Sequence, residues 1–215
     1  MAFDYEEAVP WGRSFDEYRR MFHLTAEDLS RNILGCADGP ASFNAEMSRR
    51  GHRVISCDPL YRLSADQIKK RIDAVYELVI GQTQQNQDKF VWDLISSPDE
   101  LGRVRLEAMD NFLRDYDHGK SDGRYVAAQL PHLPFDSSSF DMALCSHFLF
   151  LYSDQFSFAF HQQALDEMCR VAREVRVFPL LNYNAEPCPF VAPLVVTCST
   201  MLWLQPGSSD NSKRG

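Results

Sequence analysis

Short apolar runs and longer segments with helical periodicity alternate along this chain. The apolar runs predict strands at 32–36, at 53–57, at 124–128, in a run that ends at Cys145, and at 174–181. The segments between them predict helices that include 40–50 and a helix from Asp154 to about Val171. Strands that alternate with helices run parallel through right-handed crossovers. The pattern therefore predicts an α/β fold, a doubly wound, mostly parallel sheet with helices on both faces.

The fold is expected to begin with a short helix. Ser14 and Glu17 form an S-x-x-E pattern, in which each side chain can satisfy the backbone N–H of the other residue. We expect the helix over 14–22 to lie against the sheet or beside a ligand site.

A long helical insertion separates the second and third predicted strands. More than sixty residues lie there, whereas a simple crossover needs only about a dozen. Helix-start signals predict helices over about 64–80, 85–94 and 98–117, within an insertion of about 62–122. Two interpretations stay open, a lid over a ligand site or a cover for the edge of the sheet.

Composition and charge narrow the class of protein. Of the 215 residues, 45% are hydrophobic and 24% are charged, which predicts a globular chain with one domain over 1–205 and a disordered polar tail over 206–215. The 22 basic and 30 acidic side chains give a net charge of −8, which disfavours nucleic acid as a partner. We find neither an unbroken apolar membrane span nor a secretory signal, so a cytoplasmic location and no membrane partner are expected.

The cysteines and histidines predict no metal site. Six cysteines show no paired spacing of the zinc or redox type, and three of them, Cys36, Cys57 and Cys145, close predicted strands as small buried residues. The histidines show no ligand spacing with one another or with cysteine.

The first strand and turn carry the clearest functional signal. Residues 33–43, ILGCADGPASF, lead into a second strand that ends on Asp58. Small residues at such a turn let the backbone approach a ligand. Asp58 lies 19 residues after Gly39, close to the interval of about 20 at which an acidic residue accepts hydrogen bonds from ribose hydroxyls. These features predict a nucleotide site at the carboxyl ends of the strands.

A second segment resembles a known family. The run LPFDSSSFDMALCSHFLFLY at 133–152 is similar to a characteristic segment of the class I S-adenosylmethionine-dependent methyltransferases, and the similarity covers about 14–185. The resemblance implies a Rossmann-like fold and S-adenosyl-L-methionine as cofactor. It also implies an enzyme that transfers a methyl group to an oxygen, nitrogen or carbon atom of a small molecule, which the sequence does not identify.

The first turn departs from the pattern of that family. Gly35 stands where an acidic residue is usual, Ala37 and Ala41 stand where glycines are usual, and Gly39 is a retained glycine. Alanine can keep the close approach of the backbone if its φ stays negative. The acid usually helps to anchor the amino-acid end of the cofactor, and Asp38 is a possible substitute.

The resemblance also implies roles for residues at the ends of four strands. Asp58 would bind the ribose, residues after the second and third strands would contact the adenine, and residues after the fourth strand would lie near the methylsulfonium. His147 is the candidate catalytic base, because an imidazole can take a proton near neutral pH, and the alternative is a histidine that only shapes the site. The expected cofactor-binding residues are Leu34, Gly35, Cys36, Ala37, Asp38, Gly39, Asp58, Pro59, Leu60, Gln129, Leu130, Ser146 and His147.

The end of the chain leaves other functions open. Class I methyltransferases usually finish with two more strands, the last of them antiparallel, whereas the residues after Leu181 offer at most a helix and part of a strand. An unpaired fifth strand predicts a homodimer through that edge of the sheet. One alternative is a degenerate or merely cofactor-binding scaffold that interacts with a partner. Another is a Rossmann oxidoreductase with a nicotinamide cofactor.

Overall fold

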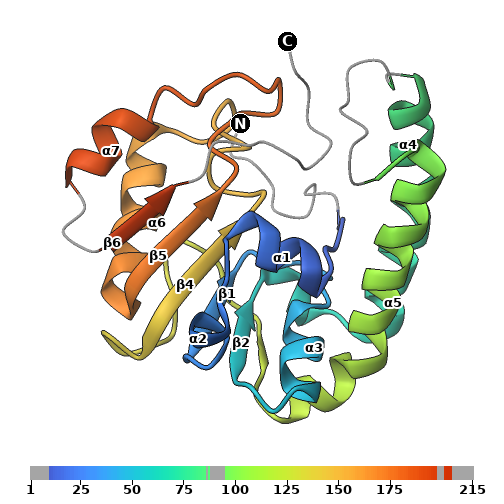
Figure 1. The fold of residues 1–215 in the computed structure, drawn as a ribbon, viewed down its shortest axis with the longest axis horizontal. Helices are drawn as coiled ribbons and strands as arrows, with labels where there is room; N and C mark the ends of the chain where they lie inside the picture. Colours follow the sequence, from blue (N-terminus) through green and yellow to red (C-terminus); the bar gives the residue numbers. More distant parts are fainter. Residues whose placement is uncertain (1–9, 86, 88–94, 198–200, 205–215) are drawn as a thin grey trace.

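The computed structural model describes residues 10–85, 87, 95–197 and 201–204, and its centre is a parallel sheet (Figure 1). The strand order is β3-β2-β1-β4-β5-β6, and every recorded pairing is parallel. The order reverses between β1 and β4, which is the point where ligands bind in such sheets. The prediction of a Rossmann-like, doubly wound fold is confirmed. The strands are β1 Ile33–Cys36, β2 Val54–Cys57, β3 Tyr125–Val126, β4 Phe140–Ser146, β5 Ala172–Phe178 and β6 Met201–Leu204.

Helices cover both faces of the sheet. On one face Tyr18, Phe43 and Met47 pack against residues of β1, β2 and β4, and on the other face Leu165 and Met168 belong to a core shared with β4 and β5. The helices are α1 Phe15–Met21, α2 Ala26–Leu29, α3 Phe43–Arg49, α4 Ala65–Gln85, α5 Pro98–Ser121, α6 Phe158–Val171 and α7 Val191–Thr197, with a 3-10 helix, η2, at Pro59–Arg62. Among the described helices, none is long and apolar enough to cross a membrane.

The predicted helix starts at Ser14, Ser64 and Ser97 are confirmed, and the one at Asp154 is wrong. Ser14 and Glu17 form the expected capping box of α1, and Ser97 caps α5. The helix expected to begin at Asp154 begins instead at Phe158, because the Ser157 side chain accepts a hydrogen bond from the backbone N–H of Phe160. A serine hydroxyl in extended backbone is a good helix N-cap, and it decides this boundary.

The helical insertion is confirmed, and its helices cover one edge of the sheet. Helices α4 and α5 contact each other and stand on the side of the molecule away from α6 and α7 (Figure 1). Helix α5 also contacts α3 and β3. Near its end the Lys120 ammonium donates hydrogen bonds to the carbonyls of Tyr61 at 2.7 Å and Leu63 at 3.2 Å. The expected short helix over 85–94 lies, beyond Gln85, almost wholly outside the described residues.

The fifth strand is paired on its outer side, so the expectation of an unpaired edge there is wrong. Strand β6 pairs parallel with β5, from Glu174 with Met201 to Val177 with Leu204. The segment between these strands contains α7 and exceeds the dozen or so residues that a parallel crossover needs. The third strand is shorter than expected, because the chain turns away after Val126 and forms a bridge between Gln129 and His132. The predicted tail over 206–215 lies outside the described residues.

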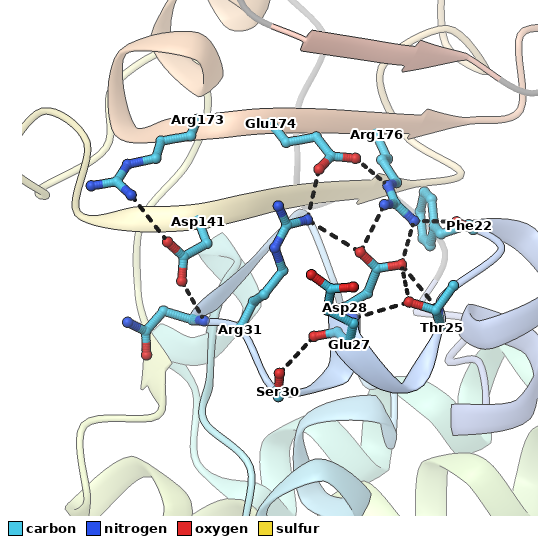
Figure 2. A network of polar contacts seen from close by, with 11 residues as sticks. Phe22, Thr25, Glu27, Asp28, Ser30, Arg31, Asp141, Arg173, Glu174 and Arg176 are labelled. Carbon is cyan, nitrogen blue, oxygen red and sulfur yellow. Dashed lines mark hydrogen bonds and ion pairs between the residues drawn. The ribbon is translucent and has the colours of Figure 1, made fainter.

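Buried charges fix the N-terminal helices to the rest of the fold. Figure 2 shows the Arg176 guanidinium on β5 between the carboxylates of Asp28 and Glu174, with a further hydrogen bond to the carbonyl of Phe22. On the neighbouring helix, Glu17 forms an ion pair with Arg105 of α5, and both side chains are buried. Helix α2 is therefore tied to β5, and α1 is tied to the helical insertion.

Candidate functional site

The strand register brings the predicted site residues together from three strands. Cys36 lies beside Cys57 on one side and beside Cys145 on the other. The residues that follow these three cysteines are Ala37, Asp58 and Ser146. The carboxyl ends of β2, β1 and β4 therefore present the first turn, the acidic residue and the Ser146–His147 pair next to one another.

The first turn is held in a conformation that glycine favours. Ala37 has φ +54° and Gly39 has φ +53°, and the Ala37 backbone N–H donates to the carbonyl of Cys57 at 2.9 Å. The condition that alanine keep a negative φ at this position is therefore not met. An alanine in left-handed backbone costs about 1–2 kcal/mol, so the turn is formed against a local strain.

We expect Ala37→Gly to raise the free energy of unfolding by about 0.5–1 kcal/mol, because relief of the left-handed strain exceeds the added freedom of the unfolded chain. Urea unfolding would measure the change. Ala41→Gly is the matched control, since Ala41 is buried and is not among the described residues with positive φ. Ala41→Gly should lower the free energy of unfolding by about 1 kcal/mol, because the unfolded chain gains entropy and a buried methyl group is removed. An equal decrease in the free energy of unfolding in both variants would contradict the strain at Ala37.

The Asp38 side chain folds back over the first strand. A Cβ atom added to Gly35 would lie 1.7 Å from Asp38 Oδ2. The Tyr18 hydroxyl donates to Asp38 Oδ1 at 2.7 Å, and the Ser56 hydroxyl donates to Asp38 Oδ2 at 2.6 Å. Burial raises the pKa of Asp38 to about 6, although both hydroxyl groups act to lower it. The carboxyl group thus occupies the space next to Gly35.

Asp58 closes the other side of the turn. Its Oδ2 accepts from the backbone N–H of Gly39 at 2.9 Å, and its Oδ1 accepts from that of Leu60 at 2.8 Å, where η2 begins. Burial raises the pKa of Asp58 to about 6, against the two backbone hydrogen bonds. A carboxylate oxygen has two lone pairs, so each oxygen keeps the capacity to accept a hydroxyl group.

The two carboxyl groups predict a particular pH dependence. The pKa of each carboxyl group is higher in the folded state than in the unfolded state, so protonation of these groups stabilises the fold. This contribution to the free energy of unfolding is lost as the pH rises through about 6. For Asp38 the expected loss is roughly 1 kcal/mol between about pH 5 and pH 8. Urea unfolding at several pH values should show a smaller loss in Asp38→Asn than in the wild type. Parallel pH profiles of the two proteins would contradict the buried charge.

His147 is held by its backbone and by its neighbour. Its φ is +52°, and its backbone N–H donates to the carbonyl of Phe178 at 2.6 Å, so β5 fixes its position beside β4. The Ser146 hydroxyl lies 2.8 Å from His147 Nδ1. Strained backbone in a non-glycine residue often marks a functional site. The contact with Ser146 uses Nδ1 and orients the imidazole ring.

The other expected contact residues differ in what they can offer. The side chains of Leu34 and Cys36 are fully buried, and Leu130 is also part of the core. These three residues can shape a ligand site only through their backbone. Pro59, Leu60 and Gln129 are partly exposed at the ends of β2 and β3, and the Asp58 backbone N–H donates to the Val126 carbonyl at 3.2 Å, which keeps these ends together.

Sequence reasoning missed two residues of this site. Tyr18 comes from α1, and no spacing along the chain connects it with Asp38. Ser56 carries only a weak sequence signal, because it is a single polar residue in an apolar strand. In the structure the residue is 1% exposed. Within the described ranges, no group of three or more histidine, cysteine or acidic residues could hold a metal ion.

Comparisons with known proteins relate this chain to a protein of similar length. No family model matches the chain. Over 190 residues it is 33% identical to the uncharacterized protein MJ0045 of Methanocaldococcus jannaschii, an alignment that covers 86% of this chain and 84% of that protein.

Proposed function

This chain belongs to the same family as MJ0045, and since the name of that relative assigns no activity, we propose a function from the site itself. The proposed activity is transfer of a methyl group from S-adenosyl-L-methionine to an oxygen, nitrogen or carbon atom of a small molecule. The resemblance of 133–152 to class I methyltransferases suggests the activity, and the site chemistry supports it.

The observation that carries the proposal is the charge around the first turn. Asp38 and Asp58 lie on either side of it, and the donors that the structure records for them are hydroxyl and backbone N–H groups. No ion pair to either residue is recorded in the described part of the chain. A buried carboxylate without a cation is costly, so such a site favours a positively charged ligand. S-adenosylmethionine carries a sulfonium and an ammonium group.

The residues present fit this cofactor. Asp58 would accept hydrogen bonds from the ribose hydroxyls, while the backbone of the turn at Gly39 would lie close to the nucleoside. Pro59, Leu60 and Gln129 would line the adenine, and the backbone N–H of Leu130 would contact its ring. When bound, the cofactor supplies a methyl group already activated for transfer, so positioning of the acceptor provides much of the rate.

His147 is the proposed base for acceptors that carry a proton. In that role its Nε2 takes the proton from an acceptor hydroxyl or amine, while the Ser146 hydroxyl stays bonded to Nδ1 and orients the ring. The structural alternative is that His147 only joins β4 to β5 through its bond to Phe178. An acceptor attacked at carbon would not need this base.

The strand order favours a second candidate. A fully parallel 3-2-1-4-5-6 sheet is the order of dinucleotide-binding domains, whereas class I methyltransferases end with an antiparallel strand. A nicotinamide oxidoreductase therefore fits the topology. Its cofactor, however, would bring a negatively charged pyrophosphate to a turn flanked by two carboxyl groups. We give the site chemistry more weight, because fold alone does not determine function.

Calorimetric titration of the purified protein separates these candidates. We expect binding of S-adenosylmethionine and S-adenosylhomocysteine and no heat from NAD or NADH. Binding of the dinucleotides alone would overturn the proposal in favour of the oxidoreductase. Binding of none of them by a folded sample would overturn it in favour of a non-catalytic scaffold.

The proposed partner is a small methyl acceptor, with no role for nucleic acid or membrane. The net charge of −8 supports the first exclusion. The proposed setting is the cytoplasm, where the free thiols of Cys36, Cys57 and Cys145 beneath the site would stay reduced.

A further inference from the structure

The space above Gly35 is filled by a side chain from the turn. The nearest atoms to a Cβ built on Gly35 are all of the Asp38 carboxyl group, at 1.7, 2.4 and 2.6 Å. An acidic residue at position 35 and the observed placement of Asp38 therefore exclude each other. The chain has one carboxyl group in this space, and it comes from three residues further along.

Three different elements build the surroundings of this carboxyl group. Tyr18 comes from α1, Asp38 from the turn and Ser56 from β2, and the three residues are 1%, 7% and 1% exposed. The two hydroxyl groups occupy one lone pair on each carboxylate oxygen. Neither hydroxyl group neutralises the charge of the Asp38 carboxylate. The carboxylate therefore still has lone pairs that can accept hydrogen bonds from a cation, and a bound cation would stabilise its buried charge.

Helix α1 is fixed so that the Tyr18 hydroxyl meets Asp38. The Tyr18 ring stacks on Phe43, the first residue of α3, with 4.6 Å between ring centroids and 12° between planes. The buried ion pair between Glu17 and Arg105 holds the same helix from the neighbouring position. The hydroxyl is therefore placed by packing on two sides and not by the hydrogen bond alone.

We propose that Tyr18, Asp38 and Ser56 form an ammonium-binding subsite. Its acidic residue comes from the turn and not from the first strand, and α1 contributes Tyr18 to the ligand site. The ligand class is a nucleoside that carries an amino-acid chain. This inference rests on the proposed function, and it assigns the amino-acid end of the cofactor to Asp38 and the ribose to Asp58. Tyr18 and Ser56 are positioning residues that keep the carboxyl group ionised and oriented.

Two ligands distinguish this subsite from the nucleoside site. S-adenosylhomocysteine carries the α-ammonium group, and 5′-methylthioadenosine is a similar nucleoside without the amino-acid chain. Calorimetry should show that Asp38→Ala lowers the affinity for S-adenosylhomocysteine about tenfold or more, which is the loss expected for a charged hydrogen bond. The affinity for methylthioadenosine should stay nearly unchanged in this variant. Asp58→Ala should lower the affinity for both ligands. Asp66→Ala, at an exposed position of α4, should change neither.

A positional exchange tests the displaced acid directly. Gly35→Asp alone should unfold or destabilise the protein, because its Cβ would overlap the Asp38 carboxyl group. The double variant Gly35→Asp/Asp38→Ala should fold and recover most of the affinity for S-adenosylhomocysteine that Asp38→Ala loses. Asp38→Asn keeps acceptor and donor atoms in place, and it provides the affinity measurement if Asp38→Ala does not fold.

The role of Tyr18 has a readout that needs no ligand. Tyr18→Phe keeps the ring stacked on Phe43 and removes the hydroxyl, so the pKa of Asp38 should rise in a carbon-detected NMR titration of the free protein. The affinity for S-adenosylhomocysteine should then begin to fall at a higher pH than in the wild type.

The outcomes separate the two proposals. Unchanged S-adenosylhomocysteine binding in Asp38→Ala, together with its loss in Asp58→Ala, would overturn the subsite and leave the proposed function standing. Equal weakening of methylthioadenosine and S-adenosylhomocysteine in Asp38→Ala would also overturn the subsite, because the residue would then act on the nucleoside. Failure of the wild type to bind either ligand would overturn the proposed function and the subsite with it.

Discussion

Replacement of Arg176 by alanine is expected to lower the free energy of unfolding by about 3–5 kcal/mol, the range found when one member of a buried ion pair is removed. The guanidinium donates to Asp28 Oδ1 at 3.0 Å and to Glu174 Oε1 at 2.7 Å (Figure 2). The Asp28 and Glu174 side chains are 10% and 9% exposed, so the variant leaves two desolvated carboxylates with weaker charge compensation. It also leaves the carbonyl of Phe22 without its 2.7 Å hydrogen bond from Arg176.

The loss should lie toward the lower end of that range, because a second cation remains. Arg31 bonds to Glu174 at 2.7 Å and to Asp28 at 3.1 Å. Domains of this size are commonly stable by only about 5–15 kcal/mol, so the variant would lose a large share of its stability. Urea unfolding followed by circular dichroism would measure the change in midpoint.

A neighbouring arginine of the same strand is the matched control. Arg173 has a side chain that is 72% exposed and lies 3.7 Å from Asp141. An exposed ion pair contributes about 0–1 kcal/mol, so Arg173→Ala should unfold almost as the wild type does. A loss below about 1 kcal/mol in Arg176→Ala would mean that Arg31 alone compensates both carboxylates.

The consequence of Arg176→Ala should reach the candidate site. Arg176 lies two residues before Phe178, whose carbonyl accepts the His147 backbone N–H. The same guanidinium anchors α2, and α1 precedes α2 directly with Tyr18 on it. The network therefore sets the position of β5 relative to the helices that carry part of the site. We expect the variant to bind S-adenosylhomocysteine more weakly even under conditions where it stays folded.

Periodic patterns predicted the layers of this fold because they depend on neighbouring residues. Apolar strands, the capping box at Ser14 and the proline-started helix at Pro98 are each encoded within a few positions, and all three are confirmed. The alternation of strands and helices gave the parallel sheet for the same reason. Boundaries depended on single hydrogen bonds, such as that of Ser157, and were less well predicted.

The pairing of β6 and the assembly around Asp38 could not be predicted in this way. Strand β6 pairs with β5 across a long crossover, and no local sequence motif marks this pairing. Asp38 meets Tyr18 across 20 positions and Ser56 across 18, and no periodicity connects them. The left-handed backbone of Ala37 is imposed by the closed turn, against the preference of alanine. Each of these features follows from tertiary contacts that override local preference.

Asp58→Ala is expected to weaken S-adenosylhomocysteine binding about 100-fold or more, because two ribose hydroxyls would each lose a charged acceptor. The variant also removes the acceptor of the Gly39 N–H at 2.9 Å, so the first turn loses one of the hydrogen bonds that hold it. Stability should change much less than affinity, since the two lost backbone hydrogen bonds are offset by removal of a buried charge. Calorimetry for binding and urea unfolding for stability would measure the two quantities on the same sample.

Asp58→Asn separates the charge from the shape of this residue. The amide keeps one acceptor oxygen for a backbone N–H, but its NH₂ group would face the second N–H and a ribose hydroxyl. Its affinity for S-adenosylhomocysteine should therefore lie close to that of Asp58→Ala. Wild-type affinity in either variant would show that the ligand does not use the end of β2, and the assignment of the ribose to Asp58 would fall. If Asp58 holds the ribose, a variant that unfolds like the wild type should lose binding of both S-adenosylhomocysteine and methylthioadenosine, because Asp58 follows β2, the neighbour of β1 at the switch point of the sheet.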